Sequence, residues 1–421
     1  EGSRASSNGC RVRLDLSGCK EFALFPGQIV AAIGVNAVGH TFVPRKIVHA
    51  LPPASDAAPA EKAQVHPVTL MSAAGPLSTT DDLSYAPLTA LLAKAVEVRP
   101  DALVLIGPFV DEQHPALSNA EVPCSYQELF ERQVLAKLSE FIEDQIQDDG
   151  KITHVVLLPS TRDVHHQPVY PQPPFAESNV VPEHCAPYLH YANNPAHVSI
   201  GGVRIGACSV DTLFLLGQQE LARTPPVAEG APKPDRMARL ASHVLGQRQL
   251  LPLFPAPTDE RAPLAVDVCA NLKAGALPSL PDILLAPSEL APFAKLCHAG
   301  VLAVNPGRLT RKAAGGNYAT ICIHPPKPPV EEPAADETPA DAEAEPAAKP
   351  EEPDMIMEAA LGLNSGVATA AEGTPAATAE SAPVVKPEEG GDKGAPSGVL
   401  PLPADAPDGL VDRAFVEVKR I

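Results

Sequence analysis

Six stretches in the middle of the chain are almost continuously apolar, and each is five to nine residues long. Stretches of helical composition separate them. Strands that are apolar on both faces and alternate with helices are typical of an α/β fold whose sheet is covered on both sides. We therefore predict buried strands at 67–71, 101–109, 152–160, 203–210, 282–288 and 300–307.

Helical spacing of apolar residues appears in the segments between these strands. We predict helices over 85–98, which follows two aspartates, over 125–147 and over 235–249. The clearest periodicity is in the second of these helices, where the recurring residues are Leu129, Phe130, Val134, Leu138, Phe141 and Ile142.

The two ends of the chain show a different pattern from the middle. From Cys10 to Ile47 the sequence alternates between apolar and polar residues and is punctuated by glycines, which indicates short strands of a small β-barrel or sandwich. The segment 51–60 is rich in proline and alanine and is typical of a linker. Residues 414–421 alternate again, which predicts a final strand.

A low-complexity tract of Ala, Pro, Glu and Thr begins at Pro328 and continues to about Ser397. It is poor in aromatic residues, so it cannot bury enough surface to offset its ordering entropy, and we predict that it is disordered. Thr338 and Thr374 are each followed by proline and are candidate phosphorylation sites, although a passive spacer is the favoured interpretation. We therefore divide the chain into domains at 1–60 and 61–327, a disordered insertion at 328–409 and a final strand of the second domain at 410–421.

The charge is concentrated in that insertion. The formal net charge is −19, and the sixteen acidic and four basic residues between Lys327 and Lys393 account for −12 of it. The chain has no basic run with interleaved aromatic residues, so we expect DNA to be contacted mainly through partners.

Cysteine spacing and hydropathy exclude several further classes of site. The eight cysteines form no CxxC pair that would seed a zinc site. The longest apolar runs are about ten residues, too short to span a bilayer, and the chain starts without the pattern of a signal peptide. We expect a protein of the cytosol or nucleus.

The loops after four predicted strands read GPFVD, PSTRD, APSEL and VNPGRLT. Their order resembles that of the calcineurin-like metallophosphoesterases. The resemblance implies a two-sheet α/β phosphodiesterase domain and, in active members, two metal ions held by the motifs DxH, GDxxD, GNH(D/E) and GHxH. At the corresponding positions this chain has Ser72, Ala74, Pro108, Asp111, Thr161, Arg162, Asp163, Pro287 and Glu289.

Most of these replacements cannot hold a divalent cation. Pro108 stands where a bridging carboxylate is needed, and Arg162 brings a fixed positive charge to the place of a metal ligand. Two-metal catalysis requires several anionic or imidazole ligands around both ions. We therefore predict an inactive phosphodiesterase domain, with no catalytic residues, no metal and no cofactor.

His165 and His166 follow the same loop and open the segment HHQPVYPQPPF. A metal role for them competes with a structural one, in which one imidazole is hydrogen-bonded, the other is exposed, and Asp163 caps the turn or pairs with Arg162. The proline-rich part is suited either to packing over the sheet end or to gripping a partner. We favour the structural interpretation for the histidines and packing for the proline-rich part.

A closer resemblance lies in LFPGQIVAAIGVNAVGHTFVPRKI, RDVHHQPVYPQPPF and VNPGRLTRKAAGGNYA. These segments resemble the B subunits, the regulatory second-largest subunits, of eukaryotic DNA polymerase alpha-primase complexes. The resemblance implies an oligonucleotide/oligosaccharide-binding (OB) domain at 1–60, with its first strands expected to be missing, joined to an inactive phosphodiesterase-like domain. It also implies a nuclear scaffold for DNA replication that binds the C-terminal, zinc-containing domain of the polymerase catalytic subunit and meets primase through the complex.

Two other functions remain open from the residues alone. One is an active metal-dependent phosphoesterase or nuclease, similar to the small subunits of archaeal replicative polymerases. The other is direct single-strand binding by the OB domain. Its clustered bases are Arg11, Arg13, Arg45 and Lys46, and we interpret Phe22, Phe25 and Phe42 as core, which favours protein docking over nucleic-acid binding.

Overall fold

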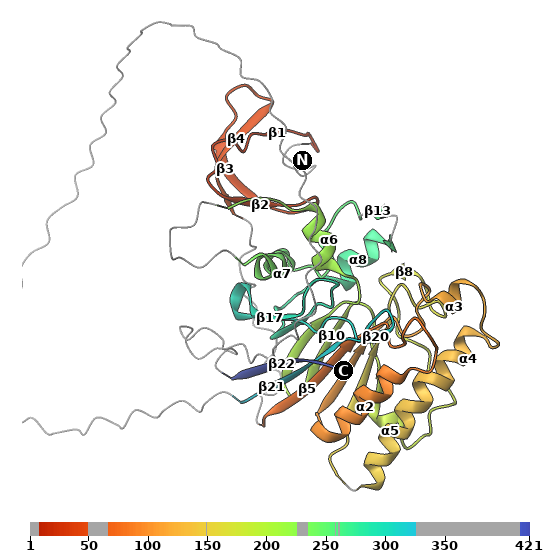
Figure 1. The fold of residues 1–421 in the computed structure, drawn as a ribbon. Helices are drawn as coiled ribbons and strands as arrows, with labels where there is room; N and C mark the ends of the chain where they lie inside the picture. Colours follow the sequence, from red (N-terminus) through yellow and green to blue (C-terminus); the bar gives the residue numbers. More distant parts are fainter. Residues whose placement is uncertain are drawn as a thin grey trace, which may run out of the picture. The chain divides into compact units, whose positions relative to one another are not determined.

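The computed structural model describes residues 8–48, 66–148, 150–224, 235–256, 258–259, 262–325 and 413–421, which Figure 1 shows as a coloured ribbon. The chain divides into two compact units, one of residues 1–327 and 397–421 and the other of residues 328–396. The second unit lies wholly outside the described residues, as do the predicted linker at 51–60 and the rest of the predicted insertion to 409.

A six-stranded sheet forms the centre of the first unit, in the order β22-β21-β5-β6-β7-β9. Its parallel part consists of β5 (Val68–Ala74), β6 (Ala102–Ile106), β7 (His154–Leu158) and β9 (Leu189–Tyr191). Next to β5 the antiparallel strands β21 (Asn317–Ile323) and β22 (Ala414–Arg420) complete the sheet. The last strand of the chain is therefore hydrogen-bonded into the same sheet as the earlier strands.

A second sheet has five strands in the order β10-β11-β16-β18-β17. The bounds are Ala196–Ile200 for β10, Val203–Ala207 for β11, Ile283–Leu285 for β16, Phe293–Leu296 for β17 and Leu302–Asn305 for β18. β11, β16 and β18 are parallel, and the two edge strands are antiparallel. All six strands predicted from apolar runs are present, as β5, β6, β7, β11, β16 and β18.

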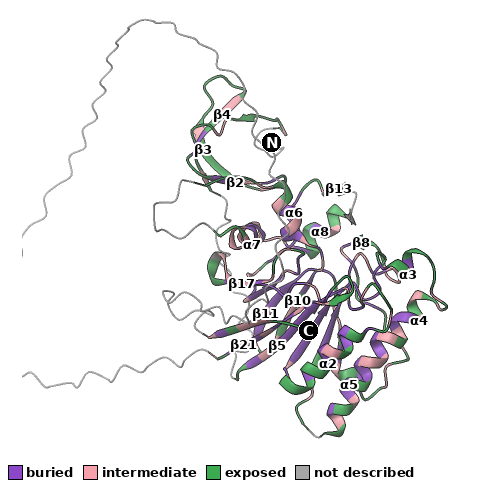
Figure 2. Cartoon of the chain, in the orientation of Figure 1, coloured by how far each residue is buried: buried purple, intermediate pink, exposed green. Residues whose placement is uncertain are grey.

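The two sheets pack on each other through one apolar cluster. Its members alternate along the strands of both sheets and include Leu70, Val104, Leu158, Ile205, Ile283 and Val304. Figure 2 shows the strands of both sheets largely in purple, as buried. Each central strand is apolar on both faces because one face meets the other sheet and the opposite face meets helices.

Helices on the outer face of the larger sheet agree with two of the three predicted helices. α2 (Ala86–Val98) corresponds to 85–98, and its residues Leu88 and Leu91 are fully buried. The helix predicted at 125–147 is α4 (Tyr126–Phe130), a π-helical turn η1 (Glu131–Leu135) and α5 (Ala136–Gln147) in succession. α2 and α5 contact each other and share a core with the sheet (Figure 1).

The smaller sheet is covered by α6 (Thr212–Gln219) and α7 (Arg236–Gln247), whose leucines pack with Leu284 and Ala303. α7 is the helix predicted at 235–249. Asp235 is its N-cap, and its carboxylate accepts hydrogen bonds from the backbone N–H groups of Met237 and Ala238. The amphipathic period therefore located this helix to within a few residues.

Short elements complete the described part of the unit. The paired short strands are β8 (Val169–Tyr170) with β15 (Ala265–Val266), β13 (Thr258–Asp259) with β14 (Ala262–Pro263), and β19 (Thr310–Arg311) with β20 (Ala314–Gly315). The short helices are α3 (Pro115–Ser118), η2 (Ala186–Tyr188), α8 (Val268–Ala274) and η3 (His298–Gly300). No helix among the described residues is both long and apolar enough to span a membrane.

The N-terminal strands form a small open sheet in the order β1-β4-β3, with bounds Arg13–Leu14, Thr41–Val48 and Ala31–Val35. β2 (Phe22–Leu24) pairs instead with β12 (Leu221–Arg223), which follows α6. Phe22 and Phe25 are buried as predicted, whereas Phe42 is half-buried. Among residues 8–48 the strands do not close into a barrel, and Ile33 of β3 is 64% exposed.

We expect Leu91→Ala to lower the free energy of unfolding by about 2 to 5 kcal/mol, because it opens a cavity under α2. Leu91 is 0% exposed and Val96, on the same helix, is 42% exposed. Val96→Ala is the matched control and should change the stability by less than about 0.5 kcal/mol. Urea unfolding followed by circular dichroism measures both, and equal losses would contradict the described packing of α2.

Candidate functional site

The loops that follow the parallel strands of both sheets meet around a cavity of about 250 Å³. Its lining includes Ala74 at the end of β5, Gly107 after β6, Ser160 after β7 and Ser209 after β11. Ligand sites of α/β proteins are commonly found at the carboxyl ends of strands, so this cavity is the candidate functional site.

Eight of the nine positions predicted as a degenerate metal site lie in or beside this cavity. The lining residues among them are Ala74, Pro108, Thr161, Arg162, Pro287 and Glu289. Asp111 lines an adjoining depression, and Asp163 contacts the residues that line the cavity. Ser72 lies two residues before the end of β5, where it is buried between Val104 and Ala319 of the neighbouring strands. The motif comparison predicted Ser72 as part of the site, whereas the structure places it inside the sheet, where it does not line the cavity.

Asp163 ties the loop after β7 to the loop after β6. Its carboxylate accepts hydrogen bonds from the backbone N–H groups of Phe109 at 2.5 Å, Val110 at 2.9 Å and Ser160 at 2.8 Å. A Cβ atom on Gly107 would lie 2.6 Å from the Asp163 carboxylate, so only glycine allows this approach. Burial raises the pKa of Asp163 to about 7, against the opposing effect of these three hydrogen bonds.

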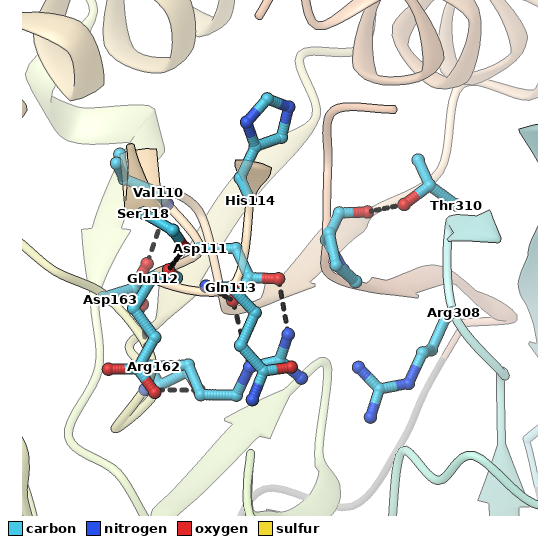
Figure 3. Close-up of polar contacts among 12 residues, drawn as sticks. Val110, Asp111, Glu112, Gln113, His114, Ser118, Arg162, Asp163, Arg308 and Thr310 are labelled. Carbon is cyan, nitrogen blue, oxygen red and sulfur yellow. Dashed lines mark hydrogen bonds and ion pairs between the residues drawn. The ribbon is translucent and has the colours of Figure 1, made fainter. Parts of the chain in front are cut away.

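Arg162 and Asp111 form a bidentate ion pair between the same two loops (Figure 3). The Arg162 Nε atom lies 3.0 Å from Asp111 Oδ1, and its Nη2 atom donates to Oδ2. The two side chains are only 18% and 7% exposed, respectively. The sequence left open whether Arg162 pairs with Asp163, and the structure shows that its partner is Asp111.

Two residues of the cavity were not singled out from the sequence. Asp211 caps α6 by accepting from the backbone N–H of Phe214 at 3.0 Å, and it also accepts from that of Glu289 at 2.7 Å. Arg308, in the loop after β18, donates to the Glu289 carboxylate at 2.8 Å. Both residues follow predicted strands within a few positions, which is the signal that would have found them.

Of the predicted arrangement, one hydrogen-bonded and one exposed imidazole, the first part is confirmed by His166 and the second is wrong, because His165 is half-buried against aromatic rings. The ring of His165 stacks on Phe130 at 4.4 Å and on Phe175 at 5.1 Å between ring centroids, and its two nitrogen atoms have no hydrogen-bond partner among the described residues. Burial lowers the pKa of His165 to about 4, so the ring is neutral at pH 7. His166 Nε2 lies 2.9 Å from the carbonyl oxygen of Pro173.

The proline-rich segment packs on the sheet end, which agrees with the interpretation favoured from the sequence. Tyr170, Gln172 and Phe175 are buried. Gln172 donates from its amide to the carbonyl of Ser160, which links the segment to the cavity wall. Val169 and three prolines, Pro168, Pro173 and Pro174, are exposed in this segment.

The described residues contain one group of three or more His, Cys, Asp or Glu side chains close enough to share a metal ion, namely Glu143, His184 and Cys185. These residues belong to α5 and to the segment before η2, and they do not line the cavity. In the cavity, the carboxylates of Asp111 and Asp163 are already occupied by a guanidinium and by backbone N–H groups. These two carboxylates therefore hold the loops after β6 and β7 together.

Residues 70–295 match the sequence model of the family formed by the B subunits of DNA polymerases alpha and epsilon. The chain belongs to this family. Residues 1–50 also match the model of the OB domain found in the B subunits of DNA polymerase alpha. The predicted resemblance to the B subunits is thereby confirmed, and an OB-domain family is found at the predicted N-terminal position.

Several similar proteins are named as the B subunit of DNA polymerase alpha. The one from Rattus norvegicus is 33% identical over 323 residues, which cover 77% of this chain and 51% of the rat protein. The one from Mus musculus is 34% identical over 323 residues, with the same coverage of 77% and 51%. The Schizosaccharomyces pombe protein is 32% identical over 345 residues, which cover 77% of this chain and 55% of the relative. The chain spans about half the length of these relatives.

We expect Arg162→Met to lower the free energy of unfolding by about 3 kcal/mol, because it leaves the buried Asp111 carboxylate without its cation. The double variant Asp111→Asn with Arg162→Met should lose less than the single variant, since it removes both charges. Chemical denaturation of the wild type, both single variants and the double variant gives the coupling free energy. Strictly additive losses would show that the pair contributes nothing.

The pKa of Asp163 predicts a pH dependence of stability. Burial raises this pKa from 3.8 to about 7, so the folded protein binds the proton more tightly than the unfolded chain. The contribution of the Asp163 carboxyl to the free energy of unfolding is fully present below about pH 4 and is lost as the pH rises through about 7. Over this range the free energy of unfolding falls by at most about 1.4 kcal/mol per pH unit. Asp163→Asn removes this slope, although it also weakens the hydrogen bonds to the three backbone N–H groups.

The difference in unfolding free energy between the wild type and Asp163→Asn should therefore shrink between about pH 4 and pH 7. Urea titrations at a series of pH values measure it. A difference that stays constant or grows with pH would contradict the raised pKa.

Proposed function

We propose that the chain is a noncatalytic accessory subunit of DNA polymerase alpha. In this role it binds the catalytic subunit as a scaffold and supports the initiation of replication by RNA-DNA primer synthesis. The observation that carries the proposal is the Arg162–Asp111 ion pair in the cleft, together with the family to which the chain belongs.

The ion pair opposes metal-dependent catalysis on electrostatic grounds. A two-metal site works by clamping the attacking and leaving oxygens of a phosphodiester between cations held by anionic ligands. In this cleft a guanidinium already neutralises Asp111, and it would repel a divalent cation placed beside it. Asp163 directs its oxygens to backbone N–H groups, so neither carboxylate is oriented to hold an ion.

The fold that we propose for the α/β domain is that of a calcineurin-like phosphodiesterase without activity. Two facing sheets with helices on their outer sides support it, as does the position of the cleft at the strand ends. We place the OB domain at 1–60 and the phosphodiesterase-like domain at 61–327 with a last strand in 410–421. The insertion at 328–409 is a spacer in this proposal.

The proposed partner is the C-terminal, zinc-containing domain of the polymerase catalytic subunit, and primase is reached through the complex. The names of the relatives support a polymerase alpha partner. We propose that β3 contacts this partner, since Ile33 is 64% exposed and Val35 is 44% exposed among the described residues. We place the complex in the nucleus, with DNA contacted mainly through the partners.

Co-expression with the C-terminal domain of the catalytic subunit tests this partner. We expect the two chains to purify together and Ile33→Glu to weaken the complex by about 1 to 2 kcal/mol, about tenfold in affinity, by placing a charge in an apolar contact. Val96→Glu, on the exposed face of α2, is the control and should leave the complex intact. Failure of the wild-type chain to co-purify would overturn the scaffold role.

A hydrolysis assay addresses the competing enzyme function. The purified complex, supplied in turn with manganese, zinc and magnesium, should not cleave single-stranded DNA or a chromogenic phosphodiester. Metal-dependent cleavage that disappears in Asp111→Asn would replace the scaffold proposal with a nuclease.

A further inference from the structure

Two guanidinium groups converge on the cleft from different sheets. Arg162 comes from the loop after β7, and Arg308 comes from the loop after β18. Figure 3 shows the Arg308 guanidinium turned toward the side of the cleft that holds Arg162. Burial lowers the pKa of Arg308, and the nearby positive charge of Arg162 lowers it further. The fold therefore holds two like charges close together at the edge of the cavity.

Carboxylates accept hydrogen bonds from only some of the N–H donors of each guanidinium. Arginine has five N–H donors in a planar fork. Asp111 accepts from Nε and Nη2 of Arg162, and Glu289 accepts from Nη2 of Arg308. The Nε atom of Arg308 is buried and has no hydrogen-bond partner among the described residues. Because that Nε atom is closed to solvent, a ligand in the cleft would instead meet the exposed parts of the two side chains, which are 18% exposed for Arg162 and 22% exposed for Arg308.

The depression that adjoins the cavity is basic at its rim. Arg162 and Arg308 line it together with Arg311 and Lys312, which are exposed on the β19–β20 hairpin. The carboxylates in its lining are Asp111 and Glu289, so cations outnumber carboxylates by four to two. Thr310 positions the hairpin by donating from its hydroxyl to the carbonyl of Pro76 at 2.9 Å.

We propose that this depression binds a phosphate group, which accepts hydrogen bonds from the guanidinium groups of Arg162 and Arg308, while Arg311 and Lys312 attract it at the rim. A tetrahedral dianion offers enough oxygen lone pairs to bridge two guanidiniums at once, and guanidinium–phosphate pairs are among the strong charge-assisted hydrogen bonds. Free phosphate and a phosphate monoester share this chemistry. The site does not depend on the scaffold function, because it concerns a cleft in the α/β domain and can be tested without the polymerase partner.

Isothermal titration of the purified chain tests the site with two probes, inorganic phosphate and adenosine 5′-monophosphate. Salt screens exposed charges, so sodium chloride is added to keep the ionic strength constant during the titration. We expect saturable binding of inorganic phosphate with one site per chain. Additional binding of the nucleotide would identify a monoester as the source, and binding of inorganic phosphate alone would identify the free anion.

Arg308→Gln should weaken phosphate binding by about tenfold or more, because it removes one of the two charged donors. The control is Arg132→Gln, whose side chain is 69% exposed on η1 and does not line the depression, and it should bind phosphate like the wild type. Far-ultraviolet circular dichroism of each variant shows whether it is folded.

Glu289→Gln separates a binding site from a structural ion pair. Glu289 is 58% exposed, so its loss should leave the fold unchanged, and it competes with phosphate for Arg308. We expect this variant to bind phosphate about threefold more tightly, which a purely structural role of Arg308 would not produce. The proposal is overturned if neither probe binds saturably above the chloride control, or if Arg308→Gln and Glu289→Gln both bind like the wild type.

Discussion

The bidentate pair between Arg162 and Asp111 joins two loops that belong to neighbouring parallel strands, and much of the cleft depends on it. The loops are already held by Asp163, whose carboxylate collects three backbone N–H groups beneath the pair. One carboxylate is thus paired with a cation, and the other accepts hydrogen bonds from peptide N–H groups. Because both are buried, a change to either partner would leave a charge or several donors unsatisfied in a poorly hydrated place.

This bracing holds the cleft at the strand ends of the α/β domain together without a bound cation. In a two-metal enzyme the cations balance the carboxylates that converge on the strand ends. Here Arg162 supplies positive charge from within the chain, and Arg308 adds a second guanidinium from the other sheet. The same positive charge that opposes a divalent cation in the proposed noncatalytic cleft would attract an oxyanion to the neighbouring depression. Both proposals therefore depend on the same electrostatic feature.

The contrast between the two parts of the described unit bears on the scaffold function. The facing sheets bury most of their apolar side chains in three clusters. These side chains are therefore not available for contact with another protein. In the N-terminal sheet, β3 is largely exposed and carries apolar side chains, while β2 leaves that sheet to pair with β12. Hydrogen bonds between Gln247 of α7 and the backbone of Ile29 also connect the two parts. The exposed apolar side chains of β3 fit the proposed assembly with another chain.

The sequence by itself determined the features that depend on local pattern. Apolar runs located six strands of the two sheets, and helical spacing located α2, the segment from α4 to α5, and α7. The order of strand-end loops also located most of the cleft, because parallel strands bring their carboxyl ends to one edge. Only the tertiary structure decided the contacts between residues far apart in the chain. Arg162 pairs with a residue 51 positions away, His165 stacks on Phe130 and Phe175, which also contact each other, and Ser72 lies inside the sheet and away from the cavity. The reason is physical: the pattern of one segment specifies which face is buried, whereas the partner of a charge or a ring depends on how separate segments pack.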